Sequence, residues 1–491
     1  MNMELRKGII AFFLLLAFAW LPGQTVYSLE SCIRQAQTQS PEARIARKSY
    51  ERIYWSYKAF RAGLLPQVRL TANTPGLVRS INGILQDDGT QVFVSQNQAL
   101  SNANLVISQQ IAPTGGTLFL QSGLRRTDVF GSSGFTQYSS TPFILTLDQP
   151  LFAFNQFKWD KQSQPLEFQR SERQYVESLE DISIDICGKY FDVYIAQLEL
   201  ENAGWNERVN DSIYNISKGR FSVGKIAEND LLQTELASLN ARQQRELAQL
   251  TLEQAIVDLA ITLGLPEDVQ MEVEPPKELQ RLEFDVDFAV DQALENRSEG
   301  VDFNLRDLNA ERDLAQARAN SRFNASINAS FGLNQTGTTL QETYNRPLDQ
   351  QAASLSLDIP ILQWGRGKAR VESAVVSKEQ VVDQIQLETR RLKRDVRFQV
   401  LRFQQLQDRV QLSEKAMEIG RRRYEVSKNR YLIGKIDITN LQLAQTEKDQ
   451  ARTAYFNTLK EYWVGYYRLR RSTLYDFISN EVLESPDLDM D

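Results

Sequence analysis

Histidine is absent from this sequence of 491 residues, and cysteine occurs only twice, at Cys32 and Cys187. Without imidazole there is no His-based catalytic triad, no His proton shuttle and none of the common zinc sites that need a histidine ligand. Two cysteines provide neither a disulfide scaffold nor a thiolate metal cluster. The sequence therefore argues against an enzyme, and we assign no catalytic residue, no metal ligand and no cofactor to it.

A basic excess is also missing, because 56 Lys and Arg residues stand against 63 Asp and Glu residues, giving a formal net charge of −7. A protein that binds nucleic acid broadly needs cationic side chains to neutralise the phosphates. The run Arg421–Arg423 has no interleaved aromatic residues, so we interpret it as a solvated helix face. The sequence predicts no nucleic-acid partner.

Long hydrophobic runs are absent except near the N-terminus, where residues 8–21 are almost all apolar and follow Arg6 and Lys7. This run is shorter than the roughly 20 residues that a membrane-spanning helix needs. We therefore predict that residues 1–24 are an export signal peptide, with a retained N-terminal anchor as the alternative. Without another such run, the exported chain is expected to have no transmembrane helix.

The chain contains one pattern twice. Leu147–Leu151 resembles Leu357–Ile361, and at the same offset Val223–Ile226 resembles Ile433–Ile436. Upstream the offset is larger, which indicates an insertion in the first half between about residues 73 and 140. The period is far too long for a solenoid, so the pattern indicates a duplicated half-molecule.

The two copies define the predicted domain organisation. Its segments are a signal peptide (1–24), a first repeat (25–264) that includes the insertion (73–140) and a tip turn (221–227), a linker (265–287), a second repeat (288–477) that includes a β hairpin (323–361) and a tip turn (431–437), and an acidic tail (478–491). Each repeat is predicted to run helix (28–63 and 288–321), β segment, very long helix, tip turn, helix. A helix of about 68 residues is roughly 100 Å long and needs partners along its length, which predicts coiled-coil packing. Several shorter helices in a compact bundle are the alternative.

The β segments alternate strictly between apolar and polar residues, as in Phe323–Phe331. Leu145 and Leu147 in the first half, and Leu355 and Leu357 in the second, fall on the apolar side of this pattern. A period of two means that the two faces meet different environments, either water and a protein core or lipid and water. The opposite face carries small uncharged side chains, and the strands have the length of membrane strands, which favours a barrel wall with lipid-facing leucines.

The number of strands is too small for one chain to close a barrel. Each half gives one clear hairpin, so we expect four wall strands, or six if residues 104–112 and 117–124 of the insertion also form strands. The smallest membrane barrels have about eight strands, and open sheet edges cannot face lipid. Several identical chains are therefore expected to share one barrel in a ring.

Short motifs in a fixed order and spacing give the chain a family resemblance. They are Leu64-Leu65-Pro66 after the first helix, Gln149–Phe152 and Ile359–Leu362 after the strands, and Phe221–Lys225 and Tyr431–Lys435 at the turns. Together they make the chain, from about residue 28 to residue 480, resemble the TolC-like outer-membrane efflux protein family.

The resemblance implies a homotrimer with a twelve-stranded barrel in the bacterial outer membrane and a helical tunnel that extends into the periplasm. It also implies a passive exit duct for a tripartite efflux pump or a type I secretion system. The partners would be a periplasmic membrane-fusion adaptor, an inner-membrane transporter and outer-membrane lipid. The insertion leaves the strand count open, because it would form a long loop, a folded-back hairpin or two extra strands.

The resemblance assigns roles to residues at the two tips. The residues implied in adaptor docking are Arg220, Gly224, Lys225, Arg430, Gly434 and Lys435. The glycines also suit a tight helix–helix turn with no further role. Many relatives have an acidic residue six positions after each tip glycine that helps form a pore constriction; Asp230 retains it here, whereas Asn440 replaces it. Asp230 is equally compatible with an ordinary solvated helix residue.

Two questions stay open at this stage. The alternative function is a periplasmic coiled-coil structural or adaptor protein without a channel, which would leave the alternating strands unexplained. Cys32 and Cys187 are predicted at similar heights along neighbouring helices, which allows a disulfide, although two buried unpaired thiols are the preferred interpretation. The sequence does not identify the transported substrate or the pump.

Overall fold

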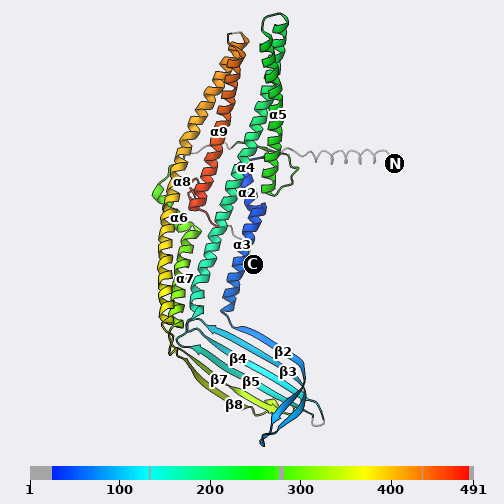
Figure 1. The fold of residues 1–491 in the computed structure, drawn as a ribbon, viewed down its shortest axis with the longest axis vertical. Coiled ribbons are helices and arrows are strands. Elements are labelled where there is room, and N and C mark those ends of the chain that lie inside the picture. Colours follow the sequence, from blue (N-terminus) through cyan, green and yellow to red (C-terminus); the bar gives the residue numbers. More distant parts are fainter. Residues whose placement is uncertain (1–24, 132–133, 276–280, 434, 486–491) are drawn as a thin grey trace, which may run out of the picture. The chain divides into compact units, whose positions relative to one another are not determined.

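The computed structural model describes residues 25–131, 134–275, 281–433 and 435–485 (Figure 1). These residues form two compact units. The first comprises residues 25–50, 172–300 and 390–485, and the second comprises residues 51–171 and 301–389. In the described part of the chain, no helix has both the length and the hydrophobicity that crossing a membrane requires.

The two halves of the chain have the same order of helices and differ in their strands. The first half contains β1 (Thr25–Tyr27), α2 (Leu29–Gln39), α3 (Pro41–Gly63), β2 (Gln67–Leu85), β3 (Gln91–Ile111), β4 (Gly116–Val129), β5 (Phe135–Pro150), α4 (Gln156–Ser222) and α5 (Glu228–Leu263). The second half contains β6 (Met271–Val273), α6 (Val286–Asn296), α7 (Ser298–Asn320), β7 (Asn324–Gly337), η1 (Glu342–Tyr344), β8 (Leu348–Asp358), α8 (Arg366–Leu432), α9 (Ile438–Thr473), β9 (Tyr475–Asp476) and β10 (Glu481–Val482). The duplicated half-molecule is confirmed, because α4 and α8 each have 67 residues and α5 and α9 each have 36.

The very long helices form as predicted. Each is about 100 Å long, and Pro165 lies inside α4 without ending it. The expectation of one continuous helix at the start of each repeat is wrong, because Ser40 separates α2 from α3 and Arg297 separates α6 from α7. Ser40 has an extended backbone because it precedes Pro41, which disfavours the helical conformation.

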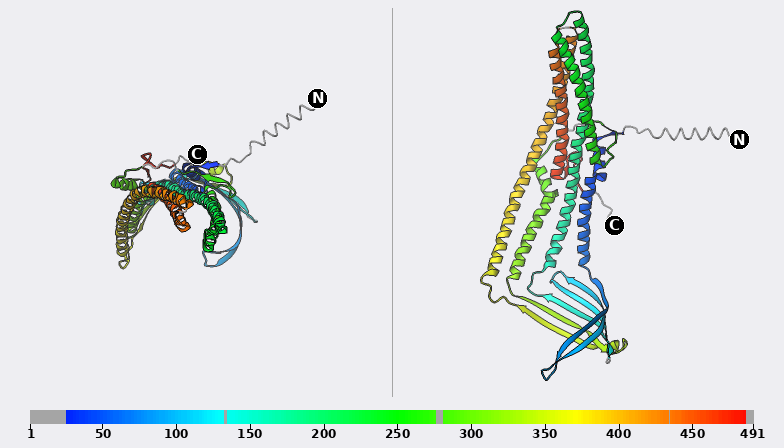
Figure 2. Two further views of the ribbon diagram at one scale, coloured as in Figure 1. Left: turned by 90° about the horizontal axis from the view of Figure 1, so that it is seen from above. Right: turned by 45° about the vertical axis from the view of Figure 1, so that its right-hand side comes forward.

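In the first unit the parts of the four long helices lie in a row, in the order α5, α4, α9 and α8 (Figure 2). Ion pairs join neighbours in this row. Glu207 of α4 pairs with Arg245 of α5 at 2.9 Å, and Asp192 of α4 pairs with Lys460 of α9 at 2.6 Å. Arg409 of α8 pairs with Glu461 of α9 at 2.8 Å. The helices α5 and α8 therefore stand at the two ends of the row.

A hydrophobic core of the first unit surrounds the middle of α4. Its fully buried side chains include Ile186, Tyr190 and Phe191. Cys32 and Cys187 are buried within this unit, and both are free thiols, in agreement with the preferred interpretation. Burial raises the pKa of each thiol, so neither is activated as a nucleophile.

The second unit contains one antiparallel sheet of six strands in the order β2-β3-β4-β5-β7-β8. The insertion between residues 73 and 140 supplies β3 and β4 and lengthens β2 and β5. The strands β3 and β4 form a hairpin, and Gly115 in its turn has a φ of +77°. Residues 104–112 and 117–124, which the sequence offered as possible strands, lie within this hairpin. Of the three alternatives for the insertion, the structure therefore has two extra strands.

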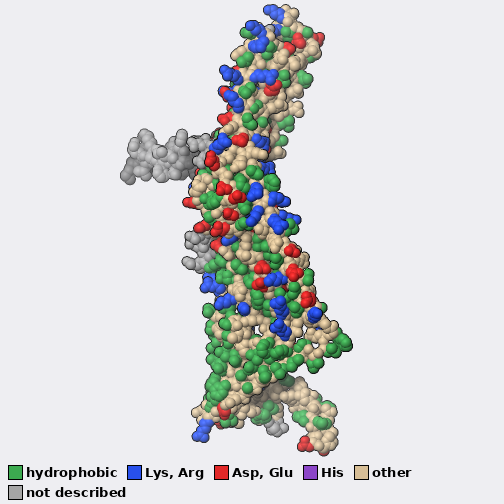
Figure 3. All heavy atoms as spheres, turned by 90° about the vertical axis from the view of Figure 1, so that its left-hand side faces the viewer, with side chains coloured by type: hydrophobic (Ala, Val, Ile, Leu, Met, Phe, Trp, Pro, Cys, Tyr) green, Lys and Arg blue, Asp and Glu red, His purple; other side chains and the backbone are tan. Residues whose placement is uncertain are grey.

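The strand register brings the predicted leucines to one face. Leu145 pairs with Phe331, and Leu147 pairs with Ala329 two residues along β7. On the other side of β7, Leu355 pairs with Ile327, and Leu357 follows on the same face. Because cross-strand partners share a face, all four leucines lie together, and Figure 3 shows hydrophobic side chains gathered over the strands.

Candidate functional site

The first tip turn is closed by the backbone of Gly224, whose φ is +69°. The Lys225 N–H donates to the Arg220 carbonyl at 2.9 Å, and the Gly224 N–H donates to the Phe221 carbonyl at 2.9 Å. This pair of bonds is the Schellman arrangement, which satisfies carbonyl groups at the end of a helix and needs a left-handed residue. Gly224 therefore ends α4 and turns the chain toward α5.

The second tip turn repeats one of these bonds. The Lys435 N–H donates to the Arg430 carbonyl at 2.8 Å, so Lys435 corresponds to Lys225 in position and in backbone bonding. Gly434 lies outside the described residues. The side chains of Lys225, Lys435 and Arg430 are exposed, whereas Arg220 is half-buried.

An exposed aliphatic side chain accompanies each tip lysine. Val223 and Ile433 are both 66% exposed and occupy equivalent positions of the two repeats. We did not single them out from the sequence as site residues, although they belong to the repeated motif. Because both side chains are exposed at equivalent positions of the two repeats, we include them in the candidate site.

The residues predicted at the constriction lie at matching positions in the first turns of α5 and α9. The Asp230 carboxylate accepts a hydrogen bond from the Ala227 N–H at 3.4 Å. In the second repeat Asp437 is the N-cap and accepts from the Asn440 backbone N–H at 2.9 Å and from its side-chain amide at 2.8 Å. Both repeats thus have exposed carboxylates at the helix N-terminus, Glu228 and Asp230 in the first and Asp437 in the second, where the helix dipole favours negative charge.

A hydrophobic cluster supports the second tip. It consists of the buried side chains of Ile213, Tyr424, Tyr431 and Leu441, which come from α4, α8 and α9. Ile436, within the tip turn, packs against it. The second tip turn is therefore packed against α4, α8 and α9 beneath its exposed side chains.

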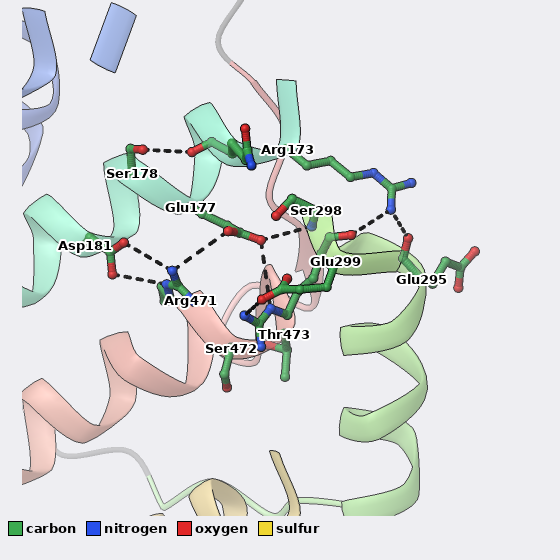
Figure 4. Close-up of polar contacts among 12 residues, drawn as sticks. Arg173, Glu177, Ser178, Asp181, Glu295, Ser298, Glu299, Arg471, Ser472 and Thr473 are labelled. Carbon is green, nitrogen blue, oxygen red and sulfur yellow. Dashed lines mark hydrogen bonds and ion pairs between the residues drawn. The ribbon is translucent and has the colours of Figure 1, made fainter. Parts of the chain in front are cut away.

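A buried ionic network joins α4 to the start of α7 and the end of α9 (Figure 4). Glu177 accepts a hydrogen bond from the Ser298 N–H at 3.0 Å and lies 3.8 Å from the guanidinium groups of Arg297 and Arg471. Arg471 also pairs with Asp181 at 3.1 Å. Each buried carboxylate or cation has partners of opposite sign, which is the arrangement of a structural network.

One carboxyl group beside this network has an altered acidity. Glu180 pairs with Arg470 at 2.9 Å, and Arg470 also pairs with Asp476 at 3.1 Å. Burial raises the pKa of Glu180 to about 7, although the positive charge of Arg470 opposes the rise. Among the described residues there is no group of three or more His, Cys, Asp or Glu side chains that is able to hold a metal ion.

The family model of the outer membrane efflux proteins matches residues 95–265 and 289–473. No curated protein matches the chain. Among solved structures, the Campylobacter jejuni CmeC outer membrane channel has a TM-score of 0.67 at 16% identity, over 94% of this chain and 90% of that one. The outer membrane protein VceC of Vibrio cholerae has a TM-score of 0.64 at 15% identity, over 91% of this chain and 95% of that one.

The two matched ranges fall on the two repeats and together cover most of the chain. The similar structures share the fold over nearly their whole length, which agrees with the duplicated, mainly helical architecture and its sheet. The chain is therefore a TolC-like member of the outer membrane efflux protein family, a channel protein of the outer membrane that extends into the periplasm.

Proposed function

We propose that three copies of this chain form a passive exit duct, which docks through its tips to a periplasmic adaptor of a tripartite efflux pump or a type I secretion system. The observation that carries the proposal is the pair of uncovered apolar stripes on the end helices of the row. The transporter in the inner membrane would supply the energy, because a duct needs no catalytic site of its own.

Each stripe runs along one face of its helix, and the α8 stripe has the seven-residue spacing of a coiled-coil seam. The α5 stripe consists of Leu232, Leu236, Leu239, Leu247 and Leu250, and each of these side chains is at least half exposed. The α8 stripe has members seven residues apart, Leu412, Ile419 and Val426, and their exposed fractions are 72%, 58% and 53%. Apolar residues at such spacing bury against a partner helix.

A neighbouring copy of the chain supplies the partner. Because α5 and α8 stand at opposite ends of the row, a second copy brings its α5 to the α8 of the first. A contact between different surfaces of identical chains forms a ring with cyclic symmetry when the rotation between neighbours closes, and the curvature of a barrel wall would provide that rotation. The family resemblance gives three copies, so twelve long helices would form the tunnel wall.

Docking at the tips is supported by their repeated chemistry. Both turns present an exposed lysine and an exposed aliphatic residue, Lys225 with Val223 and Lys435 with Ile433. Arg220, Gly224, Arg430 and Gly434 belong to the same proposed surface. In the ring, Asp230 and Asn440 would narrow the pore, and three Asp230 carboxylates would favour cations over anions. Leu145, Leu147, Leu355 and Leu357 would face lipid.

Charge reversal at both tips tests the docking role. The Lys225→Glu and Lys435→Glu double variant should lose capture by the adaptor and export, because both exposed cations become anions. Lys368→Glu changes an exposed lysine at the opposite end of α8 and serves as the matched control. Normal capture and export by the double variant would exclude docking at the tips.

The channel itself needs a separate measurement. The purified protein should have the mass of three chains and should conduct ions in planar bilayers, with both properties unchanged in the double variant. A monomeric protein without conductance would exclude the duct and would favour a periplasmic structural role.

A further inference from the structure

We propose that the barrel of this protein has eighteen strands, six from each of three chains, closed where β8 of one copy pairs with β2 of the next. The inference rests on the proposed trimer and departs from the twelve strands that the family resemblance implies. Its starting observation is the single continuous sheet of six strands in each chain.

The directions of the edge strands permit this closure. All neighbours in the sheet are antiparallel, so β2 and β8, at its two edges, run in opposite directions. Copies that enter the membrane in the same orientation, with the same face toward lipid, can meet only β8 to β2. That pair is antiparallel and continues the ladder, and repetition of this head-to-tail contact closes a ring.

Both edges are open in a single chain. Almost all residues of β2, and all but one of β8, are exposed. Unpaired backbone N–H and C=O groups cannot remain open in the hydrocarbon of a membrane. Each edge therefore needs a partner strand, and the only strand of suitable direction that the ring provides is the opposite edge of a second copy.

The stagger of the sheet matches a closed barrel. One row of cross-strand partners runs through Val68, Ile107, Leu120, Leu145, Phe331 and Gln351. At the edge of the sheet nearest the helices, β2 begins one residue before this row, at Gln67, whereas β8 continues past the row and ends at Asp358. The sheet edge thus steps by about one residue per strand, which is the stagger of an eight-stranded barrel with a strand tilt of about 36°.

The same stagger predicts the register of the contact between copies, with Gln67 of one copy opposite Asp358 of the next. Apolar side chains then meet on one face, where Val68 faces Leu357 and Leu70 faces Leu355. A register shifted by one residue would place these leucines opposite the polar face of β2, so the alternation of both strands favours the first register.

Extra strands widen the barrel, because barrel diameter grows roughly linearly with strand number. Eighteen strands give about one and a half times the diameter of twelve, and membrane barrels of 16–18 strands enclose an aqueous channel. The polar face of the sheet, which includes Ser354, Ser356 and Asn328, would line this wider lumen.

Disulfide cross-linking in membranes tests the contact between copies. A chain with Leu70→Cys and Leu355→Cys should form a covalent ladder that ends at three chains on oxidation, because opposed antiparallel residues lie within disulfide distance. Val68→Cys with Leu357→Cys is a second, independent pair. The unsubstituted chain, with both native thiols buried, is the background control.

A pair from β4 separates the alternatives. Leu120→Cys with Leu355→Cys should give no ladder, because β4 is interior to the sheet. If β2 and β3 lay outside the wall, the same stagger over four strands would place Leu120 of one copy opposite Leu355 of the next, so a ladder from this pair would overturn the proposal in favour of twelve strands. A ladder that ends at two chains would overturn both the eighteen strands and the trimer. An intact trimer by native mass, without cross-links from either edge pair, would overturn the edge pairing alone.

Discussion

Gly224 is the residue at which the backbone conformation restricts side-chain choice most clearly among the described tip residues. Its φ of +69° lies in the left-handed region, which β-branched residues resist. Gly224→Val should therefore lower the free energy of unfolding by more than about 1 kcal/mol, as measured by denaturant unfolding, and should reduce export. The proposed trimer should persist, because the hydrogen bonds of this turn are local.

The matched control lies in the same helix. Gly219 has no neighbouring atoms within 4 Å of an added Cβ and belongs to the regular part of α4, so Gly219→Val should not lower stability. Equal losses in the two variants would exclude the left-handed turn as the cause.

Glu180 gives a residue-scale prediction about pH. Its pKa is about 7 in the folded state, against 4.5 for an ordinary glutamate, so the folded state binds this proton more tightly than the unfolded state. The stability due to this proton is complete below about pH 4.5 and is lost as the pH rises through 7. Glu180→Gln removes this titration, so the variant should be more stable than the parent at pH 8, by up to about 3 kcal/mol, and similar to it near pH 4.5.

Unfolding free energies at the two pH values check this difference. Glu201→Gln changes an exposed carboxylate on the same helix and should leave the pH dependence of the parent unchanged. A constant difference between Glu180→Gln and the parent at both pH values would mean that the Glu180 proton is not linked to folding.

At the scale of the elements, local sequence patterns predicted the long helices and the hairpin of β7 and β8. The remaining strands depend on pairing between residues far apart in the sequence. The strands β7 and β8 were predictable because one face is apolar and the other polar. Within β3, Ser95–Gln98 and Ser101–Asn104 are largely polar on both faces, so no period of two appears there. Their strand conformation depends on ladders to β2 and β4, which a local pattern does not contain.

The candidate site divides in the same way. Gly224, with Lys225 after it, was predictable because a glycine between two helical patterns indicates a helix end. The network around Glu177 was not, because its partners Arg297 and Arg471 are far away in the sequence and only the fold brings them together. Charge in a helix sequence does not indicate which residues become buried.

The two faces of the sheet should respond differently to the same substitution. Arginine at Leu145 or Leu355, on the apolar face, should impair assembly by about 2–4 kcal/mol if the residue lies near the membrane midplane. Ser354→Arg, on the opposite face of β8, should assemble normally and change conductance. Trimer yield and single-channel current measure the two effects, and equal assembly defects would refute the assignment of the faces.

At the scale of the whole molecule, the apolar stripes should control assembly. Ile419→Glu places a charge in the exposed α8 stripe, so the proposed trimer should dissociate to folded monomers in detergent. Gln411→Glu adds the same charge at an exposed polar position of the same helix and is the control. Light scattering reports the mass, and an Ile419→Glu protein that stays trimeric would exclude this stripe as a subunit contact.

The insertion adds strands as a pair, and this parity has a consequence for how such barrels change in evolution. One added strand would deliver the chain to the wrong side of the membrane, and α4 would then start on the outside. An added hairpin returns the chain to the side it left, so both edges keep their directions and the helices need no rearrangement. Pore width in this architecture is therefore free to grow by one hairpin per subunit at a time, without any change to the helices whose tips form the proposed docking surface.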